Sequence, residues 1–98
     1  MKRESSFQAD LKKDLKKRFP DSLVVKSDPL QVQGIPDLLI FCGRRWAALE
    51  CKRQSRASHR PNQDYYVDKM NQMSFSRFIY PENKEDVLNE LQEFFSEE

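Results

Sequence analysis

The sequence has few of the residues that build disulfide scaffolds, zinc sites or membrane spans. Its 98 residues include two cysteines, Cys42 and Cys51, and one histidine, His59. Two cysteines are too few for a secreted disulfide framework, and they lack the further ligands of a zinc site. No apolar run approaches the roughly 20 residues of a transmembrane helix, and the Met-Lys-Arg-Glu start leads into a charged segment rather than a signal peptide. We therefore expect a cytoplasmic protein with no membrane partner, whose cysteines are reduced and buried.

The composition favours a small globular domain. Apolar residues make up 38% of the chain and aromatic residues 11%, which is enough for a packed core, while the charged fraction of 34% favours solubility. No internal repeat, low-complexity tract or linker interrupts the sequence, so we expect a single domain over residues 1–98. A domain of this size buries only about 60 to 65% of its unfolded surface, and pairing of two chains would enlarge a thin core.

The net charge of +1 conceals an uneven distribution of charge along the chain. Residues 1–60 carry 14 lysines and arginines against 7 acidic residues, whereas residues 61–98 carry 3 against 9. Clustered cations are what phosphate binding requires, although a solvated helix face and a flexible loop would give the same counts. The candidate DNA-binding residues are Lys12, Lys13, Lys16, Lys17, Arg18, Arg44, Arg45, Arg53, Arg56 and Arg60.

Hydrophobic periodicity predicts the first elements of the fold. An apolar residue recurs at every fourth position from Phe7 to Phe19, which predicts an amphipathic helix over residues 4–19 that ends before Pro20. Residues 23–25 read as a short strand, and a turn-rich connection follows. The next elements are two apolar strands at 37–42 and 46–52, joined as a hairpin by Gly43-Arg44-Arg45 and covered on both faces.

The second half of the chain predicts two helices and one more strand. The first two elements are a mobile loop at 54–60 and a helix that begins at Pro61 and carries the stripe Gln63, Tyr66, Val67, Met70 and Met73. A strand at 75–80 follows. The last element is a helix capped by Asn83 with Asp86, which carries apolar residues from Val87 to Phe95 and runs nearly to the C-terminus. The order α-β-β-β-α-β-α predicts an α/β fold in which helices flank a mixed sheet.

Asp37, Glu50 and Lys52 are the ionisable residues of the predicted hairpin strands. Side chains two residues apart in a strand share a face, so Glu50 and Lys52 project together while Cys51 points to the opposite layer. If Gly43-Arg44 forms a two-residue turn, Asp37 lies directly opposite Glu50. Opposed Cβ atoms are about 4.5 to 5.5 Å apart, and two carboxylates at that spacing repel each other unless they share a hard divalent cation. The pattern predicts a metal site.

This prediction depends on the length of the turn. A loop of two or four residues keeps Asp37 and Glu50 on one face, whereas a three-residue loop without a bulge would separate them. The alternative for Glu50 and Lys52 is an ordinary surface ion pair, which contributes about 0 to 1 kcal/mol. The apolar strand around them argues against that alternative.

Two polar residues on the predicted helices are further candidates for the site. Glu4 lies three residues before Phe7, on the buried stripe of the first helix, and Gln63 lies one turn before Tyr66. A carboxylate and an amide there would reach into the same site. The alternatives are that Glu4 favours the helix N-terminus and that Gln63 is a capping or surface group.

Aromatic residues have ordinary explanations beside functional ones. Trp46 is suited to stacking on a base, but a strand aromatic is more often part of the core or its rim. His59 is a lone loop residue for which solvent exposure is the simpler expectation. The aromatic residues of 65–80 either pack in the core or form a dimer seam.

The arrangement of these residues resembles the PD-(D/E)xK nuclease superfamily. The matching residues are Glu4, Ile35-Pro36-Asp37, Glu50-Cys51-Lys52 and Gln63. In particular, Gly34-Ile35-Pro36-Asp37 and Arg60-Pro61-Asn62-Gln63 are similar to its VRR-NUC and phage Holliday-junction-resolvase branches. The resemblance spans nearly the whole chain and implies a restriction-endonuclease-like αβββαβ core with a C-terminal helix. No second lysine or histidine follows Lys52 that could act as an additional general base, so no residue is assigned to that role.

The resemblance implies a metal-dependent endonuclease that hydrolyses phosphodiester bonds in DNA. Asp37, Glu50 and the backbone carbonyl of Cys51 would hold Mg²⁺ or Mn²⁺, with Glu4 as a candidate ligand of a second ion. Lys52 would balance the charge that builds on phosphorus. The catalytic residues implied are Glu4, Asp37, Glu50, Lys52 and Gln63. If the chain comes from a phage, we expect it to act in the cytoplasm of the host cell.

A dimeric Holliday junction resolvase is the activity that the resemblance favours. A domain this small has little protein to spare for reading bases, so we expect a two-fold homodimer to recognise branched or four-way-junction DNA by its shape. The runner-up is a flap, replication-fork or restriction-type nuclease. The alternative from another class is a noncatalytic module that binds DNA or RNA and uses the carboxylates structurally.

Overall fold

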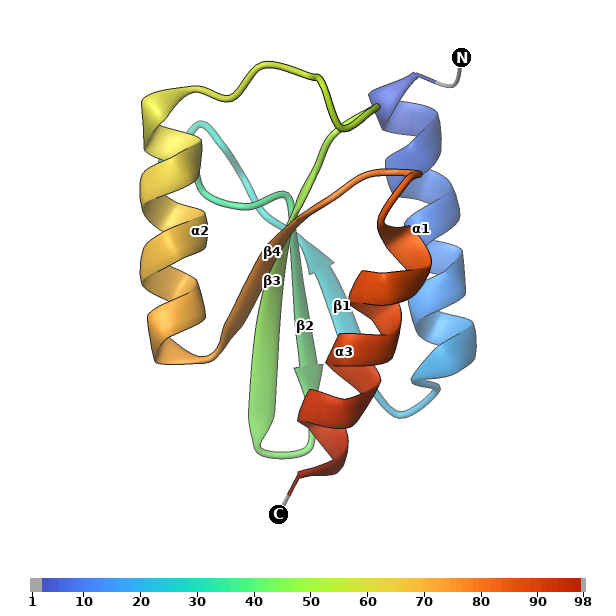
Figure 1. Cartoon of the computed structure of the whole chain (residues 1–98). Helices are drawn as coiled ribbons and strands as arrows, with labels where there is room; N and C mark the ends of the chain where they lie inside the picture. Colours follow the sequence, from blue (N-terminus) through green and yellow to red (C-terminus); the bar gives the residue numbers. More distant parts are fainter. Residues whose placement is uncertain (1–2, 98) are drawn as a thin grey trace.

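A four-stranded sheet lies between helices in the computed structural model, which describes residues 3–97 (Figure 1). The elements are α1 (Glu4–Arg18), β1 (Leu23–Lys26), β2 (Leu38–Cys42), β3 (Arg45–Cys51), α2 (Pro61–Met73), β4 (Phe75–Ile79) and α3 (Lys84–Ser96). The strand order is β1-β2-β3-β4, antiparallel from β1 to β3, while β4 pairs with β3 in parallel. The predicted α/β class, element order and mixed sheet are confirmed.

The side of the sheet that faces α1 and α3 holds the hydrophobic core (Figure 1). Side chains alternate between the faces of a strand, so every second residue of β2 and β3 points to this side. Core residues from the two strands and the two helices include Leu38, Ile40, Leu49, Leu11, Leu15 and Leu91. The other side of the sheet is covered by α2, which packs on β3 and β4.

The hairpin between β2 and β3 has the two-residue turn on which the metal-site prediction depends. Cys42 pairs with Arg45, which leaves Gly43 and Arg44 as the turn. Gly43 has a φ of +62°, while no residue other than glycine has a positive φ in the described part of the chain. A glycine at the first position of a two-residue turn is typical of type II′, whose twist matches that of the strands.

Three predictions about individual side chains are wrong. Cys42 is half-buried rather than buried, because it ends β2. Met73 is 67% exposed rather than on the packed stripe, because it is the last residue of α2. Asn83 precedes α3 as predicted, but its side chain does not cap the helix; it bonds back to the end of β4, accepting from Tyr80 N–H and donating to Phe78 O.

Helix and strand bounds otherwise follow the sequence closely. Each strand differs from its predicted range by a single residue at one or both ends, and α3 begins directly after Asn83, as predicted. Trp46 is half-buried. No helix between residues 3 and 97 is both long and apolar enough to cross a membrane.

Candidate active site

The register of β2 and β3 brings Asp37 and Glu50 together at one end of the hairpin. Leu38 pairs with Leu49, so the next residues outward along the two strands, Asp37 and Glu50, face each other. The backbone N–H of Cys51 donates a 2.9 Å hydrogen bond to Asp37 Oδ2, which fixes this carboxyl group against β3. The structure therefore places both predicted carboxyl groups on one face of the sheet.

Glu50 and Lys52 are buried although both carry ionisable groups. Glu50 is 3% exposed and Lys52 is 6% exposed. Burial of an ion is costly unless partners compensate for the loss of water. Such burial excludes the alternative of an ordinary surface ion pair at these two positions.

Gln63 links the two buried groups. Its Oε1 accepts a 2.7 Å hydrogen bond from Lys52 Nζ, and its Nε2 donates a 3.0 Å hydrogen bond to Glu50 Oε2. An amide can serve a cation and an anion at once because it has both an acceptor and donors. Lys52 Nζ also donates to the backbone oxygen of Ser58, at 3.1 Å. The structure places Gln63 inside the site rather than at the surface.

The facing carboxyl groups disfavour each other's ionised form. Burial, followed by the charge of Asp37, raises the pKa of Glu50 to about 8. Burial also raises the pKa of Asp37, while the Cys51 N–H bond and the charge of Lys52 act in the opposite direction. Two carboxyl groups in this state favour either a proton or a bound cation between them.

Glu4 begins α1 and reaches the rim of the same site. The residue is exposed, contrary to the predicted position on a buried stripe, because no helical turn precedes it. Partial burial and the charge of Asp37 nevertheless raise the pKa of its carboxyl group. Glu4 lines a hollow of about 340 Å³ together with Lys52 and Gln63. Among residues 3–97, no three histidine, cysteine or acidic side chains lie close enough together to hold a metal ion. Glu4 therefore lies near Asp37 and Glu50 without forming a three-residue cluster with them.

An open cleft of about 480 Å³ gives access to Asp37 and Glu50. Its walls are the loop at 29–35 and the start of α2. Gly34 allows these walls to meet: its φ is +89°, and a Cβ at this position would lie 2.4 Å from the Cβ of Asn62. The carboxyl groups are therefore shielded by the protein yet open to a ligand.

The predicted cations other than Arg18 divide into two groups. The first group lies on the loop that borders the site and comprises Arg53, Arg56 and Arg60. The second group lies in the later part of α1 and at the β2–β3 turn, away from the carboxyl pair, and comprises Lys12, Lys13, Lys16, Lys17, Arg44 and Arg45 (Figure 1). Arg45 also packs over the ring of Phe94 at 5.0 Å and pairs with Glu97 at 3.7 Å. Only the first group adjoins the candidate site.

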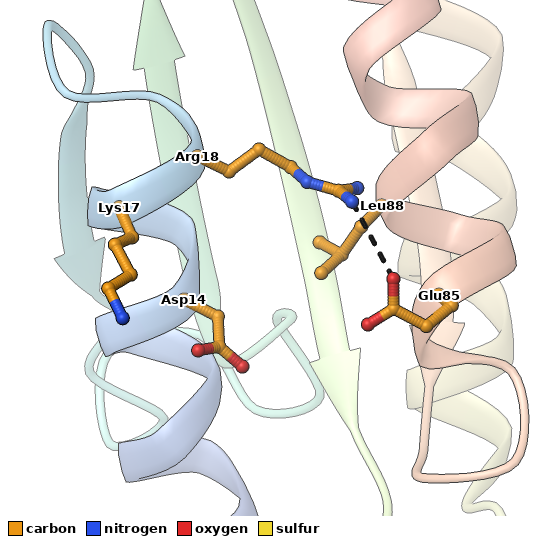
Figure 2. A pocket seen from close by; sticks show the side chains of 5 residues that line it. All are labelled: Asp14, Lys17, Arg18, Glu85 and Leu88. Atoms are coloured by element: carbon orange, nitrogen blue, oxygen red, sulfur yellow. Dashed lines mark ion pairs between the residues drawn. The ribbon is translucent and has the colours of Figure 1, made fainter.

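A second hollow, of about 350 Å³, lies between α1 and α3 and contains ordinary surface charges (Figure 2). Arg18 extends from α1 toward Glu85 of α3, with Nη2 and Oε2 3.6 Å apart. Lys84 pairs with Asp14 in the same region. Arg18, a candidate phosphate-binding residue, is thus engaged within the protein, and we assign this hollow a structural role.

Comparisons with known proteins bear on the fold. No family model and no curated protein matches the sequence. Among solved structures, the chain is similar to Hjc of Archaeoglobus fulgidus, a Holliday junction resolvase from an archaeal hyperthermophile. The two share a TM-score of 0.54 and 15% sequence identity over 78% of this chain and 67% of that chain. The chain has the restriction-endonuclease-like fold.

The sequence singled out side chains that the structure brings together at the candidate site, but it did not indicate the backbone groups that hold them. Besides the carbonyl of Ser58, the N–H of Arg60 donates a 3.0 Å hydrogen bond to Gln63 Oε1 as part of a capping box. A glutamine three residues into a helix was the available signal for the second contact. No sequence pattern signals the first, because a backbone carbonyl carries no side-chain identity.

Proposed function

We propose that the chain is a metal-dependent nuclease that hydrolyses phosphodiester bonds in DNA. One observation carries this proposal: Asp37 and Glu50 face each other at a cleft, with the ammonium group of Lys52 connected to Glu50 through Gln63. Like charges held together in a buried place cost stability, and a module that only binds nucleic acid would gain nothing from them. Similarity of fold to a Holliday junction resolvase supports the same class of activity.

The donor set fits a hard divalent cation. Carboxylate and carbonyl oxygens are the ligands that Mg²⁺ and Mn²⁺ prefer. We propose that Asp37, Glu50 and the backbone carbonyl of Cys51 hold the ion, with Glu4 at the rim as the candidate ligand of a second one. When bound, the ion would supply Lewis acidity at the phosphate and make hydroxide accessible at neutral pH.

Lys52 and Gln63 supply the rest of the site. Lys52 is positioned to bind a phosphate oxygen and to offset the negative charge that accumulates there in the transition state. Gln63 fixes the ammonium group of Lys52 relative to Glu50 through its two hydrogen bonds. Arg53 and Arg60 border the same hollows and would bind the flanking phosphates.

The substrate that we propose is branched DNA, with a Holliday junction cut by a homodimer as the specific case. The fold of Hjc supports this case. A two-fold dimer would place two sites on one junction. The runner-up within the same chemistry is a nuclease that acts on flaps, forks or linear duplex.

Cleavage of a matched set of DNA substrates tests the proposal. The purified chain is incubated with linear, nicked, flap and four-way-junction DNA of the same sequence, with Mg²⁺ or with EDTA. We expect symmetric nicks in the junction with Mg²⁺ and none with EDTA. Cleavage of linear duplex in preference to the junction would contradict the resolvase assignment, and binding without cleavage of any substrate would favour the noncatalytic module.

A further inference from the structure

His59 is the one histidine of the chain, and it makes two contacts that the proposed chemistry does not use. Its ring stacks on Phe78 of β4, with centroids 3.9 Å apart and planes inclined by 16°. Its Nδ1 lies 3.0 Å from Asp64 Oδ1 in the first turn of α2. A carboxylate only accepts hydrogen bonds, so the ring nitrogen is the donor. His59 is exposed, as expected from the sequence, yet it contacts a strand and a helix at once.

The residues on either side of His59 hold the Lys52–Gln63 pair. The carbonyl of Ser58 accepts from Lys52 Nζ at 3.1 Å, and the N–H of Arg60 donates to Gln63 Oε1 at 3.0 Å. Both contacts are made by the backbone, so their geometry depends on where the chain runs rather than on which side chains flank His59. A displacement of this three-residue segment would move both contacts together.

The beginning of the same loop is fastened elsewhere. Ser55 donates from its N–H and its hydroxyl to the carboxylate of Glu82, at 3.0 to 3.2 Å. These bonds hold Ser55 but make no contact with the Lys52–Gln63 pair. The loop that the sequence predicted to be mobile is therefore fastened at both ends, and the His59 end is the one that adjoins the site.

We propose that His59 is a positioning residue that sets the place of the Lys52 ammonium group by pinning segment 58–60 to β4 and α2. The proposal deepens the nuclease function and rests on it for the catalytic consequence. His59 acts through the backbone of its neighbours and need not touch DNA or metal. Because reacting groups displaced by about 1 Å lose much of their effect on the rate, a loosened segment should lower turnover.

The test compares His59→Ala, which removes both contacts, with His59→Phe, which retains an aromatic ring to stack on Phe78. With four-way-junction DNA and Mg²⁺, we expect His59→Ala to lower kcat roughly ten- to hundred-fold at an unchanged KM, and His59→Phe to recover part of the loss. Glu85→Gln is the matched control, because it removes a surface contact between α1 and α3 (Figure 2) and should leave kcat unchanged.

A second readout reports on Lys52 without requiring nuclease activity. Acetylation of each lysine by acetic anhydride is followed by mass spectrometry, with the exposed Lys17 as the internal reference. We expect Lys52 to react roughly ten-fold faster in His59→Ala than in the wild type or Glu85→Gln, because its two acceptors are displaced more often.

The outcomes separate this proposal from the proposed function. Unchanged acetylation of Lys52 in His59→Ala overturns the positioning role, whether or not the chain cuts DNA. Faster acetylation with unchanged kcat in an active enzyme overturns it as well, because the position of Lys52 would then have no effect on turnover. If the wild type cuts none of the substrates, the nuclease function fails, and the acetylation result alone decides whether His59 holds Lys52.

Discussion

The hollow between α1 and α3 and the cleft at Asp37 and Glu50 differ in the charges that face each other within them. Between α1 and α3, charges of opposite sign face each other near the surface, as Arg18 faces Glu85 (Figure 2). At the end of the β2–β3 hairpin, two acidic groups face each other, and of these Glu50 is buried and Asp37 is half-buried. The first arrangement pairs opposite charges, whereas the second places two acidic groups side by side.

This difference distinguishes a structural cluster from a functional one. Exposed ion pairs contribute about 0 to 1 kcal/mol to stability, so the ion pairs between α1 and α3 can be removed with little loss of stability. Buried like charges are unfavourable for stability and persist where a site requires them. Removal of a charge should therefore have contrasting effects in the two places, and four substitutions test the contrast.

The largest effect should come from Asp37→Asn. This substitution keeps an oxygen that can accept from Cys51 N–H but removes a metal-binding charge. We expect cleavage of four-way-junction DNA to fall on the order of a thousand-fold or more, equivalent to about 4 kcal/mol, with junction binding retained. Rates from single-turnover assays and affinities from gel shifts measure the two quantities, and cleavage near the wild-type rate would remove Asp37 from the site.

Lys52→Ala should rank next. Loss of an ammonium group that stabilises transition-state charge costs roughly 10²- to 10³-fold in kcat. Lys52→Arg keeps the charge with a different shape and should recover part of the activity. A Lys52→Ala enzyme with normal kcat and a raised KM would instead show that this residue only binds DNA.

Glu50→Gln should stabilise the metal-free protein while it abolishes cleavage. The pKa of Glu50 in the folded state is raised to about 8, so the folded state holds this proton more tightly than the unfolded chain does. Wild-type stability should therefore fall as the pH rises from about 4.5 to 8, whereas glutamine carries no such charge. We expect Tm of the variant at pH 8 to exceed that of the wild type by roughly 4–8 °C for each kcal/mol gained.

The pH dependence of the Tm difference provides the control for the gain in stability of Glu50→Gln. Near pH 4, where the wild-type carboxyl group is protonated in both states, the difference in Tm between Glu50→Gln and the wild type should vanish. A variant that is less stable than the metal-free wild type at pH 8 would show that the ionised carboxyl group is accommodated without a cation.

Glu85→Gln should have the smallest effect. Its side chain is 74% exposed, so loss of the contact with Arg18 should change the free energy of unfolding by less than about 0.5 kcal/mol. Urea denaturation measures the free energy of unfolding, and junction cleavage measures kcat, which should be unchanged. A marked loss of either would show that the hollow between α1 and α3 is more than a surface charge cluster.

The structural features that could be predicted from the sequence are those that depend on local interactions along the chain. Gly43 indicated a tight turn but left its length open, and the observed two-residue turn sets Asp37 opposite Glu50. Periodicity identified α1 and the face that it buries. These features need no knowledge of how distant segments pack.

Features that depend on tertiary packing were not predictable. The contact of His59 with Phe78 requires β4 to lie beside β3 after the α2 crossover, and a lone loop histidine does not reveal that. The need for Gly34 arises from the approach of Asn62, far along the chain. Glu4 was placed on a buried stripe because periodicity ignores helix ends, where the covering turn is missing.

Binding of Mn²⁺ in the absence of DNA is the most direct test of the central claim, that Asp37 and Glu50 form a cation site. Isothermal titration of the wild type should detect binding, and the double variant Asp37→Asn, Glu50→Gln should show none while it remains folded by circular dichroism. Glu85→Gln should bind as the wild type does. Equal binding of Mn²⁺ by the double variant and the wild type would contradict the account.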